Sequence, residues 1–211
     1  MDDTPAFRPP ALDAILADAS ACGFRMSCEE RAGSLLAVLA ASKPGGLILE
    51  LGTGVGAGAA WLLHGMSPDA RLLTVDHDPV VQAVAARHLG GDGRVSFTVA
   101  DADDWLDSYR GPRFALAYVD CFPGKFHRAD DLLWWLEPGG LYLADDLLPQ
   151  ATWPRDHQPR VDACLAQMTG HPDLLAAPMT WASGLLLGSR TRPAAGEPRQ
   201  HADVARSPGG R

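Results

Sequence analysis

The sequence predicts an α/β fold: a seven-stranded, mostly parallel sheet with helices on both faces. Short runs that are apolar on both faces, such as LILEL at 47–51 and FALAYVD at 114–120, alternate with segments of helical periodicity. The 211 residues, 46% hydrophobic and 21% charged, suffice for one domain with a full core. The last two strand candidates follow each other with no helix between them, which predicts an antiparallel hairpin at one edge of the sheet.

Two helices are expected before the first strand. One covers about 11–21, and the second begins at Ser27, which has the capping-box spacing to Glu30, and ends near Ala41. The alternation that follows predicts strands at 47–51, 72–76, 95–100, 114–120, 141–145, 174–178 and 184–189, with helices at about 57–66, 79–89, 102–109, 126–136 and 157–169.

Composition limits the domain organisation and the partners. Residues 1–190 are expected to form a single domain, with lid helices over about 11–42 and a core over about 47–189, and 191–211 a disordered tail rich in Pro, Gly and charge. The formal charge of −8 disfavours nucleic acid and anionic membranes and favours a small-molecule partner. The four cysteines are scattered, and neither a signal peptide nor a membrane-length apolar run is present, so the expected location is cytoplasmic.

A glycine loop, GTGVGAG at 52–58, follows the first strand and opens a helix. Glycines let the backbone approach a ligand closely, and a helix N-terminus attracts polar or anionic groups. Asp76 ends the next strand, from where an acidic side chain can hold ribose hydroxyls. NAD and S-adenosylmethionine (SAM) both fit this geometry. The GxGxG spacing departs from the dinucleotide pattern, and the carboxylate of Glu50 suits an amine and repels a pyrophosphate, which favours SAM.

Several motifs together carry a family resemblance. LILELGTGVGAGAAWL is similar to the first motif of class I methyltransferases, TVDHDP resembles their ribose-binding second motif, and VADADDWL resembles their adenine-contacting third. FALAYVD with LEPGGLYLADD resembles the small O-methyltransferases of the catechol and caffeoyl-CoA type, and RMSCEERAG resembles the leader that closes over their cofactor. The resemblance covers about residues 11–189 and implies a Rossmann-like class I methyltransferase fold and a SAM-dependent activity.

The resemblance also implies which residues bind the cofactor. They are Glu50, Gly52, Gly54 and Gly56 at the methionine part, Asp76 and His77 at the ribose, Asp101 and Ala102 at the adenine, Met26 and Ser27 over the cofactor, and Asp120 beside it. Other interpretations stay open for three of them. Asp76 and Asp101 can instead cap the helices that follow them, and Met26 can belong to the core.

In metal-dependent members of that family, an aspartate ending the fourth strand and an Asp-Asn pair ending the fifth hold a divalent cation. The matching residues here are Asp120, Asp145 and Asp146, which implies Mg²⁺ or another divalent cation that binds a vicinal diol and lowers its hydroxyl pKa. The Asp-Asp pair adds a carboxylate, which needs a proton or a cation nearby. We expect both aspartates to face the ligand, although Asp145 can instead orient the substrate and Asp146 can cap a turn.

The general base is the least constrained assignment. The family places a lysine three residues after the fourth-strand aspartate, whereas Lys125 lies five residues after Asp120, in CFPGKF. Pro123 and Gly124 can loop this lysine back, so Asp120 and Lys125 are the catalytic candidates, with an exposed surface lysine as the alternative. His127 and His157 are weaker candidates, because exposed loop histidines are common.

The function predicted from the sequence is SAM-dependent methylation of a hydroxyl on a small molecule, with a divalent cation as one form of assistance. Three alternatives remain: a methyltransferase that uses no metal, a SAM- or nucleotide-binding module without catalysis, and, more distantly, a Rossmann dehydrogenase. A homodimer through the leader helices or the C-terminal hairpin is an open expectation. The sequence does not identify the methyl acceptor, since variable loops shape its binding site.

Overall fold

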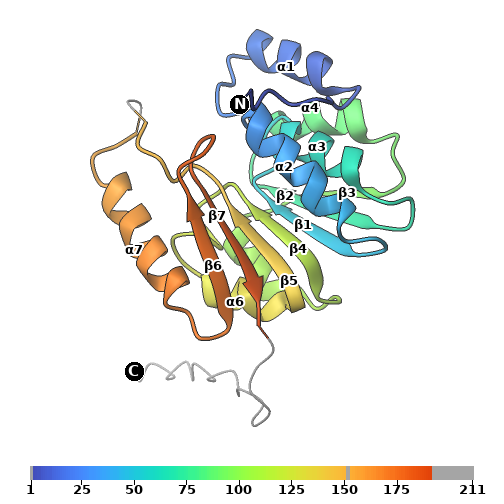
Figure 1. Cartoon of the computed structure of the whole chain (residues 1–211). Coiled ribbons are helices and arrows are strands. Elements are labelled where there is room, and N and C mark those ends of the chain that lie inside the picture. The colour runs from blue at the N-terminus through green and yellow to red at the C-terminus, as the bar shows by residue number, and fades with distance from the viewer. Residues whose placement is uncertain (1, 151–152, 192–211) are drawn as a thin grey trace, which may run out of the picture.

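The computed structural model describes residues 2–150 and 153–191 (Figure 1). Apart from Thr191, the predicted tail at 191–211 lies outside these residues. The helices are α1 (Leu12–Ala21), α2 (Glu30–Ala41), α3 (Ala57–Gly65), α4 (Pro79–Leu89), α5 (Ala102–Ser108), α6 (Ala129–Trp135) and α7 (His157–Thr169). The strands are β1 (Leu47–Leu51), β2 (Arg71–Asp76), β3 (Val95–Val99), β4 (Phe114–Val119), β5 (Leu136–Ala144), β6 (Leu174–Met179) and β7 (Leu185–Arg190).

The strands form one seven-stranded sheet in the order β3-β2-β1-β4-β5-β7-β6. The first five strands of the chain are parallel, while β7 runs antiparallel to both of its neighbours, β5 and β6. The predicted mostly parallel sheet with an antiparallel edge hairpin is therefore confirmed. The chain order reverses between β1 and β4, and ligands of open α/β sheets bind at such a switch point, beyond the carboxyl ends of the strands.

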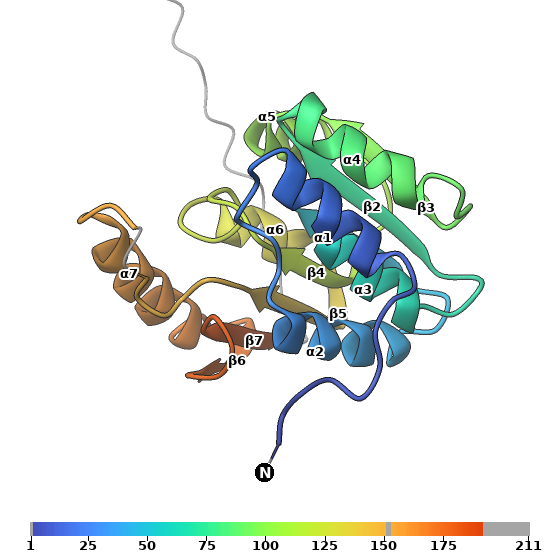
Figure 2. The ribbon, with the colours of Figure 1, turned by 90° about the horizontal axis from the view of Figure 1, so that it is seen from above.

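Helices cover the sheet on both faces (Figures 1 and 2). The four helices α1, α2, α3 and α4 pack against one face of the sheet through one hydrophobic cluster. The helices α5, α6 and α7 pack against the other face through a second cluster. On the first face α2 and α3 approach closely at two glycines. Gly33 lies under the fully buried indole of Trp61, and Gly65 lies against the backbone of Ala37. This contact matters for the site, because the segment that leads into α2 lines the pocket described below.

Three predicted boundaries are wrong. The helix expected from 126 begins at Ala129, because residues 122–127 form a turn in which the Gly124 amide donates to the His127 carbonyl at 2.7 Å, and Arg128 takes a left-handed conformation. The strand expected at 141–145 begins at Leu136, across a register shift against β4. Ser27 forms no capping box, since Glu29 is the N-cap of α2 and no side chain caps it.

Two expectations from composition can be compared with the structure. All four cysteines are free, as expected from their scattered positions. Among the described helices, none is long and apolar enough to cross a membrane.

Candidate functional site

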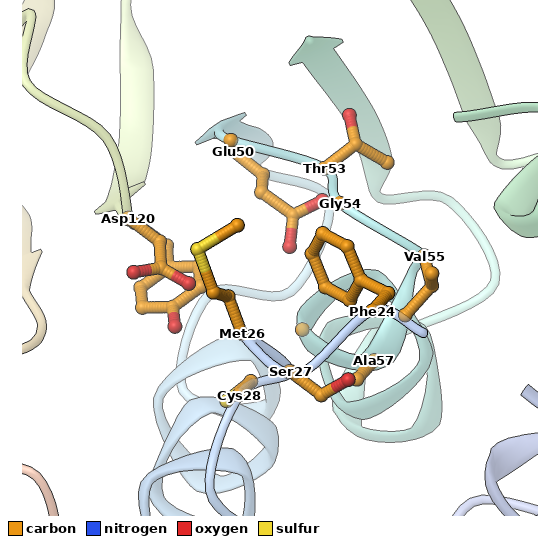
Figure 3. Close-up of a pocket in the computed structure, with 13 residues that line it drawn as sticks. Phe24, Met26, Ser27, Cys28, Glu50, Thr53, Gly54, Val55, Ala57 and Asp120 are labelled. Atoms are coloured by element: carbon orange, nitrogen blue, oxygen red, sulfur yellow. The ribbon is translucent and has the colours of Figure 1, made fainter. Parts of the chain in front are cut away.

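A pocket lies beyond the carboxyl ends of β1 and β4, where the leader segment 24–28 passes opposite the glycine loop (Figure 3). The Asp120 amide donates to the Leu51 carbonyl at 2.9 Å, which holds the ends of the two strands side by side. The residues that line the pocket are Phe24, Met26, Ser27, Cys28, Glu50, Gly52, Thr53, Gly54, Val55, Ala57, Gly58, Tyr118 and Asp120. The pocket thus brings together Met26, Ser27, Glu50, Gly52, Gly54 and Asp120 of the predicted set.

Glu50 is a fully buried carboxylate at the base of this pocket. Its Oε2 accepts a hydrogen bond from the Thr74 hydroxyl at 2.5 Å, whereas its Oε1 has no hydrogen-bond partner among the described residues. Burial raises the pKa of Glu50 to about 8. A buried carboxylate oxygen without a donor is costly unless a ligand supplies one. The site therefore fits a ligand that brings a cationic donor, such as an ammonium group, to Oε1.

A chain of hydrogen bonds fixes the other oxygen of Glu50. When Glu50 is ionised, the Thr74 hydroxyl must donate its hydrogen bond to Oε2. The Thr53 hydroxyl, whose oxygen lies 2.6 Å from that of Thr74, must therefore donate to Thr74. The amide of Gln82 donates in turn to the Thr53 hydroxyl at 3.0 Å and to the Thr98 carbonyl at 3.1 Å. Gln82, Thr53 and Thr74 thus form a relay in which each donates to the next member, and Thr74 donates to Glu50. The relay was missed in the sequence, because its members come from the glycine loop, two strands and α4.

The glycine loop is tied to Asp76. Gly54 has a φ of +52°, and its amide donates to Asp76 Oδ2 at 2.7 Å, while the Asp78 amide donates to Oδ1 at 2.9 Å. Asp78, rather than Asp76, caps α4 through the amides at its start. Gly56 does not line the pocket: a Cβ there would lie 2.6 Å from the Cβ of Ala85, so this glycine lets the glycine loop approach α4.

The remaining cofactor candidates border the pocket differently. Met26 lines it with 76% of its surface exposed and is not a core residue. The side chain of His77 is 82% exposed and its Nδ1 lies 3.5 Å from Asp76 Oδ1. Asp101 caps α5 by accepting the Asp103 amide at 2.8 Å. The structure therefore places four predicted residues outside the lining of this pocket, at or just after the ends of β2 and β3: Asp76, His77, Asp101 and Ala102.

Asp145 does not line the pocket, although the sequence predicts that it faces the ligand. It is 2% exposed, and donors of the protein occupy both of its oxygens. Oδ2 accepts the Tyr118 hydroxyl at 2.8 Å, and Oδ1 accepts the Asp146 amide at 2.7 Å as well as the hydroxyl of Ser183. Burial raises the pKa of Tyr118 well above its usual value, so its hydroxyl remains protonated and keeps donating. The carboxylate is tolerated in the interior because it is saturated with hydrogen bonds.

Replacing Tyr118 with Phe tests this account. The change removes a donor from a buried carboxylate, so we expect the free energy of unfolding to fall by about 2–3 kcal/mol. Tyr142→Phe is a matched control, because Tyr142 is equally buried but donates to the neutral carbonyl of Gly124 at 2.8 Å. That change should cost about 1 kcal/mol. Urea unfolding of both variants measures the difference, and equal losses would contradict the role of Asp145 as the acceptor.

The donor set does not fit the divalent cation that the resemblance implies. Within residues 2–150 and 153–191, no group of three or more His, Cys, Asp or Glu side chains is placed to hold a metal ion. The oxygens of Asp145 are already occupied. Asp146 has a φ of +59°, and its Oδ1 accepts the Gln150 amide at 2.9 Å. Of the three predicted ligands, only Asp120 lines the pocket.

Lys125 is not a surface lysine. Its side chain is buried, and its Nζ donates to the backbone carbonyl of Asp145 at 2.9 Å and lies 5.2 Å from the ring centre of Phe126. Gly124, with a φ of +84°, packs against Leu132 and turns the chain back as its position after a proline predicts. The structure therefore brings Lys125 next to the pair of aspartates but not into the lining of the pocket.

An aromatic cluster borders the carboxylates on the side of α7. His157 is buried, and its ring packs against Trp153, Phe126 and Phe122 with centroids 3.8, 5.1 and 6.0 Å away. Its Nε2 has no partner among the described residues, and burial lowers the pKa of His157. His127, by contrast, is exposed and lies 3.1 Å from Asp103. His157, the first residue of α7, is therefore buried, whereas the sequence predicts an exposed loop residue.

Comparison with known proteins finds similarity to methyltransferases. Residues 49–147 match a family model described as a methyltransferase domain. A catechol O-methyltransferase from Mycobacterium tuberculosis is 32% identical over 124 residues, which cover 57% of this chain and 56% of that protein. A relative from Mycolicibacterium smegmatis is 34% identical over 95 residues, or 45% of its length. The chain thus spans about half the length of these curated relatives.

Solved structures resemble nearly the whole chain. A cofactor-bound protein from MTB is 25% identical with a TM-score of 0.79, covering 90% of this chain and 93% of that one. The O-methyltransferase TomG from Streptomyces achromogenes, in complex with SAM, is 23% identical with a TM-score of 0.76, covering 88% and 91%. The strand order, the pocket position and these likenesses agree. Residues 49–147 match a methyltransferase domain, and the chain has the class I fold of its methyltransferase neighbours and is similar to O-methyltransferases of the catechol type.

Proposed function

We propose that this protein is a SAM-dependent methyltransferase that methylates a hydroxyl group of a small molecule. The unpartnered oxygen of Glu50, buried beneath the glycine loop, carries the proposal. It offers a single acceptor for the ammonium of the methionine part, and Asp76, whose Oδ2 accepts the Gly54 amide, is the residue that we assign to the ribose. The likeness to a SAM-bound O-methyltransferase and to a catechol O-methyltransferase supports both the cofactor and the oxygen acceptor.

The chemistry assigned to the chain is binding, alignment and proton removal. When bound, the cofactor supplies a methyl group on a sulfonium, which the acceptor oxygen attacks in line. Asp120 lines the pocket opposite Glu50, and burial together with the charge of Asp145 raises its pKa well above the usual value. A carboxylate with a raised pKa is a better proton acceptor, so Asp120 takes the proton of the acceptor hydroxyl. No step of this proposal runs through a metal ion.

We assign the methyl acceptor to the α7 side of Asp120. Phe122, Phe126 and Trp153 offer apolar faces there, and Arg160 lies 5.6 Å from the Phe122 ring. A small, partly apolar molecule with a hydroxyl fits these surfaces better than a nucleic acid, because the chain carries a net charge of −8.

Calorimetric titration with S-adenosylhomocysteine (SAH), SAM and NAD tests the proposal. We expect SAH and SAM to bind and NAD not to bind, since the acidic side chain of Glu50 suits an ammonium group and offers a pyrophosphate no cationic partner. Asp76→Ala should weaken SAH binding about tenfold or more through the loss of ribose contacts. Asp69→Ala, an exposed aspartate near Gly45, is the control and should bind SAH normally. Tight NAD binding without SAH binding would refute the proposal, and SAM binding without methyl transfer to any hydroxyl would leave a binding module.

A further inference from the structure

Three carboxylates, those of Asp120, Asp145 and Asp146, follow the ends of β4 and β5. The buried side chain of Lys125 places a positive charge beside the Asp145–Asp146 pair. The chain has 16 arginines but only two lysines, Lys43 and Lys125. Lys125 is 3% exposed, although lysine side chains are rarely buried without a partner. Its ammonium reaches the carbonyl of Asp145 at 2.9 Å, directly behind the pair of aspartates.

The charge of Lys125 acts on the carboxylates around it. Burial and the charge of Asp145 raise the pKa of Asp120, and the Lys125 ammonium opposes this rise. The same ammonium opposes the rise in the pKa of Asp146, which burial and Asp145 cause. The carboxylate of Asp145 is stabilised differently, by hydrogen bonds from the hydroxyls of Tyr118 and Ser183 and from the Asp146 amide. Each of the three carboxylates is therefore compensated from within the chain.

We propose that the buried Lys125 ammonium takes the place of the divalent cation beside the Asp145–Asp146 pair, so that the site works without a metal. The side chain cannot be a metal ligand while it is an ammonium, and its donor already occupies the Asp145 carbonyl. The proposal also accounts for the Asp-Asp pair, since the extra negative charge of Asp146 has a cation beside it. The effect on turnover rests on the proposed function, but the balance of charge does not.

Binding of Mn²⁺, followed by the loss of the free-ion EPR signal, tests the substitution directly. Lys125→Met removes the ammonium, frees the Asp145 carbonyl and leaves Asp120 and Asp146 uncompensated, so this variant should bind Mn²⁺ about tenfold more tightly than the wild type. Lys43→Met is the matched control: the Nζ of Lys43 also donates to a backbone carbonyl, that of Gly139 at 2.9 Å, but Lys43 is only partly buried. It should behave as the wild type does.

A double-mutant cycle tests the charge balance without any ligand. If Lys125 compensates Asp120, Asp120→Asn should raise the melting temperature of the Lys125→Met protein by about 2–4 °C more than it changes that of the wild type. A Lys125→Met protein too unstable to isolate should become isolable with Asp120→Asn. Additive effects, no such rescue, or a wild type that binds Mn²⁺ as tightly as the Lys125→Met variant would each overturn the proposal.

Turnover distinguishes this inference from the proposed function. Methylation by the wild type should persist unchanged in excess EDTA, and Lys125→Met should lower kcat more than it raises KM, because Asp120 acts in the chemical step. Loss of turnover in EDTA, restored by Mg²⁺, would overturn the metal-free site while leaving the methyltransferase intact. If instead SAM did not bind at all, the proposed function would fail, and the Mn²⁺ and melting measurements would still decide the role of Lys125.

Discussion

Replacing Glu50 with Gln is expected to abolish tight SAH binding and, at the same time, to stabilise the ligand-free protein at neutral and alkaline pH. Binding is lost because the amide offers no charge to the ammonium of the ligand at Oε1. The protein gains stability because burial raises the pKa of Glu50 to about 8, so that ionising this side chain opposes folding.

The sign and the pH window follow from linkage. The folded protein holds the proton of Glu50 up to about pH 8, whereas the unfolded chain releases it near the ordinary glutamate pKa of 4.5. The wild type therefore loses stability as the pH rises between these two values, by about 5 kcal/mol in total. Gln does not titrate. The difference in the free energy of unfolding between Glu50→Gln and the wild type should be small at pH 5 and widen steadily toward pH 8.

Urea unfolding at several pH values, alongside SAH titration, measures both effects. Glu137→Gln is the control, because Glu137 is an exposed glutamate on β5 and should alter neither binding nor the pH dependence. For the wild type, SAH should bind more tightly as the pH rises from 6 toward 8, since an ammonium ligand favours the ionised carboxylate. A difference in stability that is constant across this range would show that Glu50 is already ionised in the empty protein.

Substituting Gly65 with Ala is expected to cost about 3 kcal/mol of stability through overpacking. A Cβ on Gly65 would lie 1.9 Å from the carbonyl oxygen of Ala37 and 2.6 Å from its carbonyl carbon. Both contacts are to the backbone of α2, so no rotamer change relieves them and the two helices must separate. Alanine usually favours a helix over glycine by about 1 kcal/mol, which makes a loss at this position informative.

The same substitution should also weaken SAH binding. The leader segment 24–28, which lines the pocket, continues directly into α2, so a displaced α2 moves Met26 and Phe24 away from the glycine loop. Gly91→Ala is the control, because a Cβ at Gly91 meets no atom within 4 Å. Thermal unfolding and SAH titration of both variants provide the measurement. An unchanged melting temperature for Gly65→Ala would mean that α2 and α3 are not closely packed.

The sheet was predictable because each strand has a local sequence pattern that indicates it. Runs such as LILEL and FALAYV are too apolar for an exposed element, and Gly54 and Asp120 follow them at the carboxyl ends, where ligands bind in this architecture. The turn at Gly124 was also readable, because Pro123 and Gly124 together disfavour a continued helix.

The burial of Asp145 was not predictable, because it depends on the rest of the fold. Its three donors are the hydroxyls of Tyr118 and Ser183, which lie 27 and 38 residues away in the chain, and the Asp146 amide. No local pattern distinguishes a carboxylate that will be saturated in the interior from one that will face a ligand. The same reason hides the relay that ends at Glu50, since the pairing of β1 with β2 brings Thr74 to Glu50 and Gln82 reaches the relay from α4.

The single open oxygen of Glu50 has a consequence for the reaction cycle of the proposed enzyme. The ammonium group that it binds is the same before and after the methyl group leaves, so this contact holds SAM and SAH equally well. Such uniform binding cannot accelerate the chemical step. It retains the product as firmly as the substrate, and the protein is therefore expected to be inhibited by its own SAH, with release of that product limiting the rate of turnover.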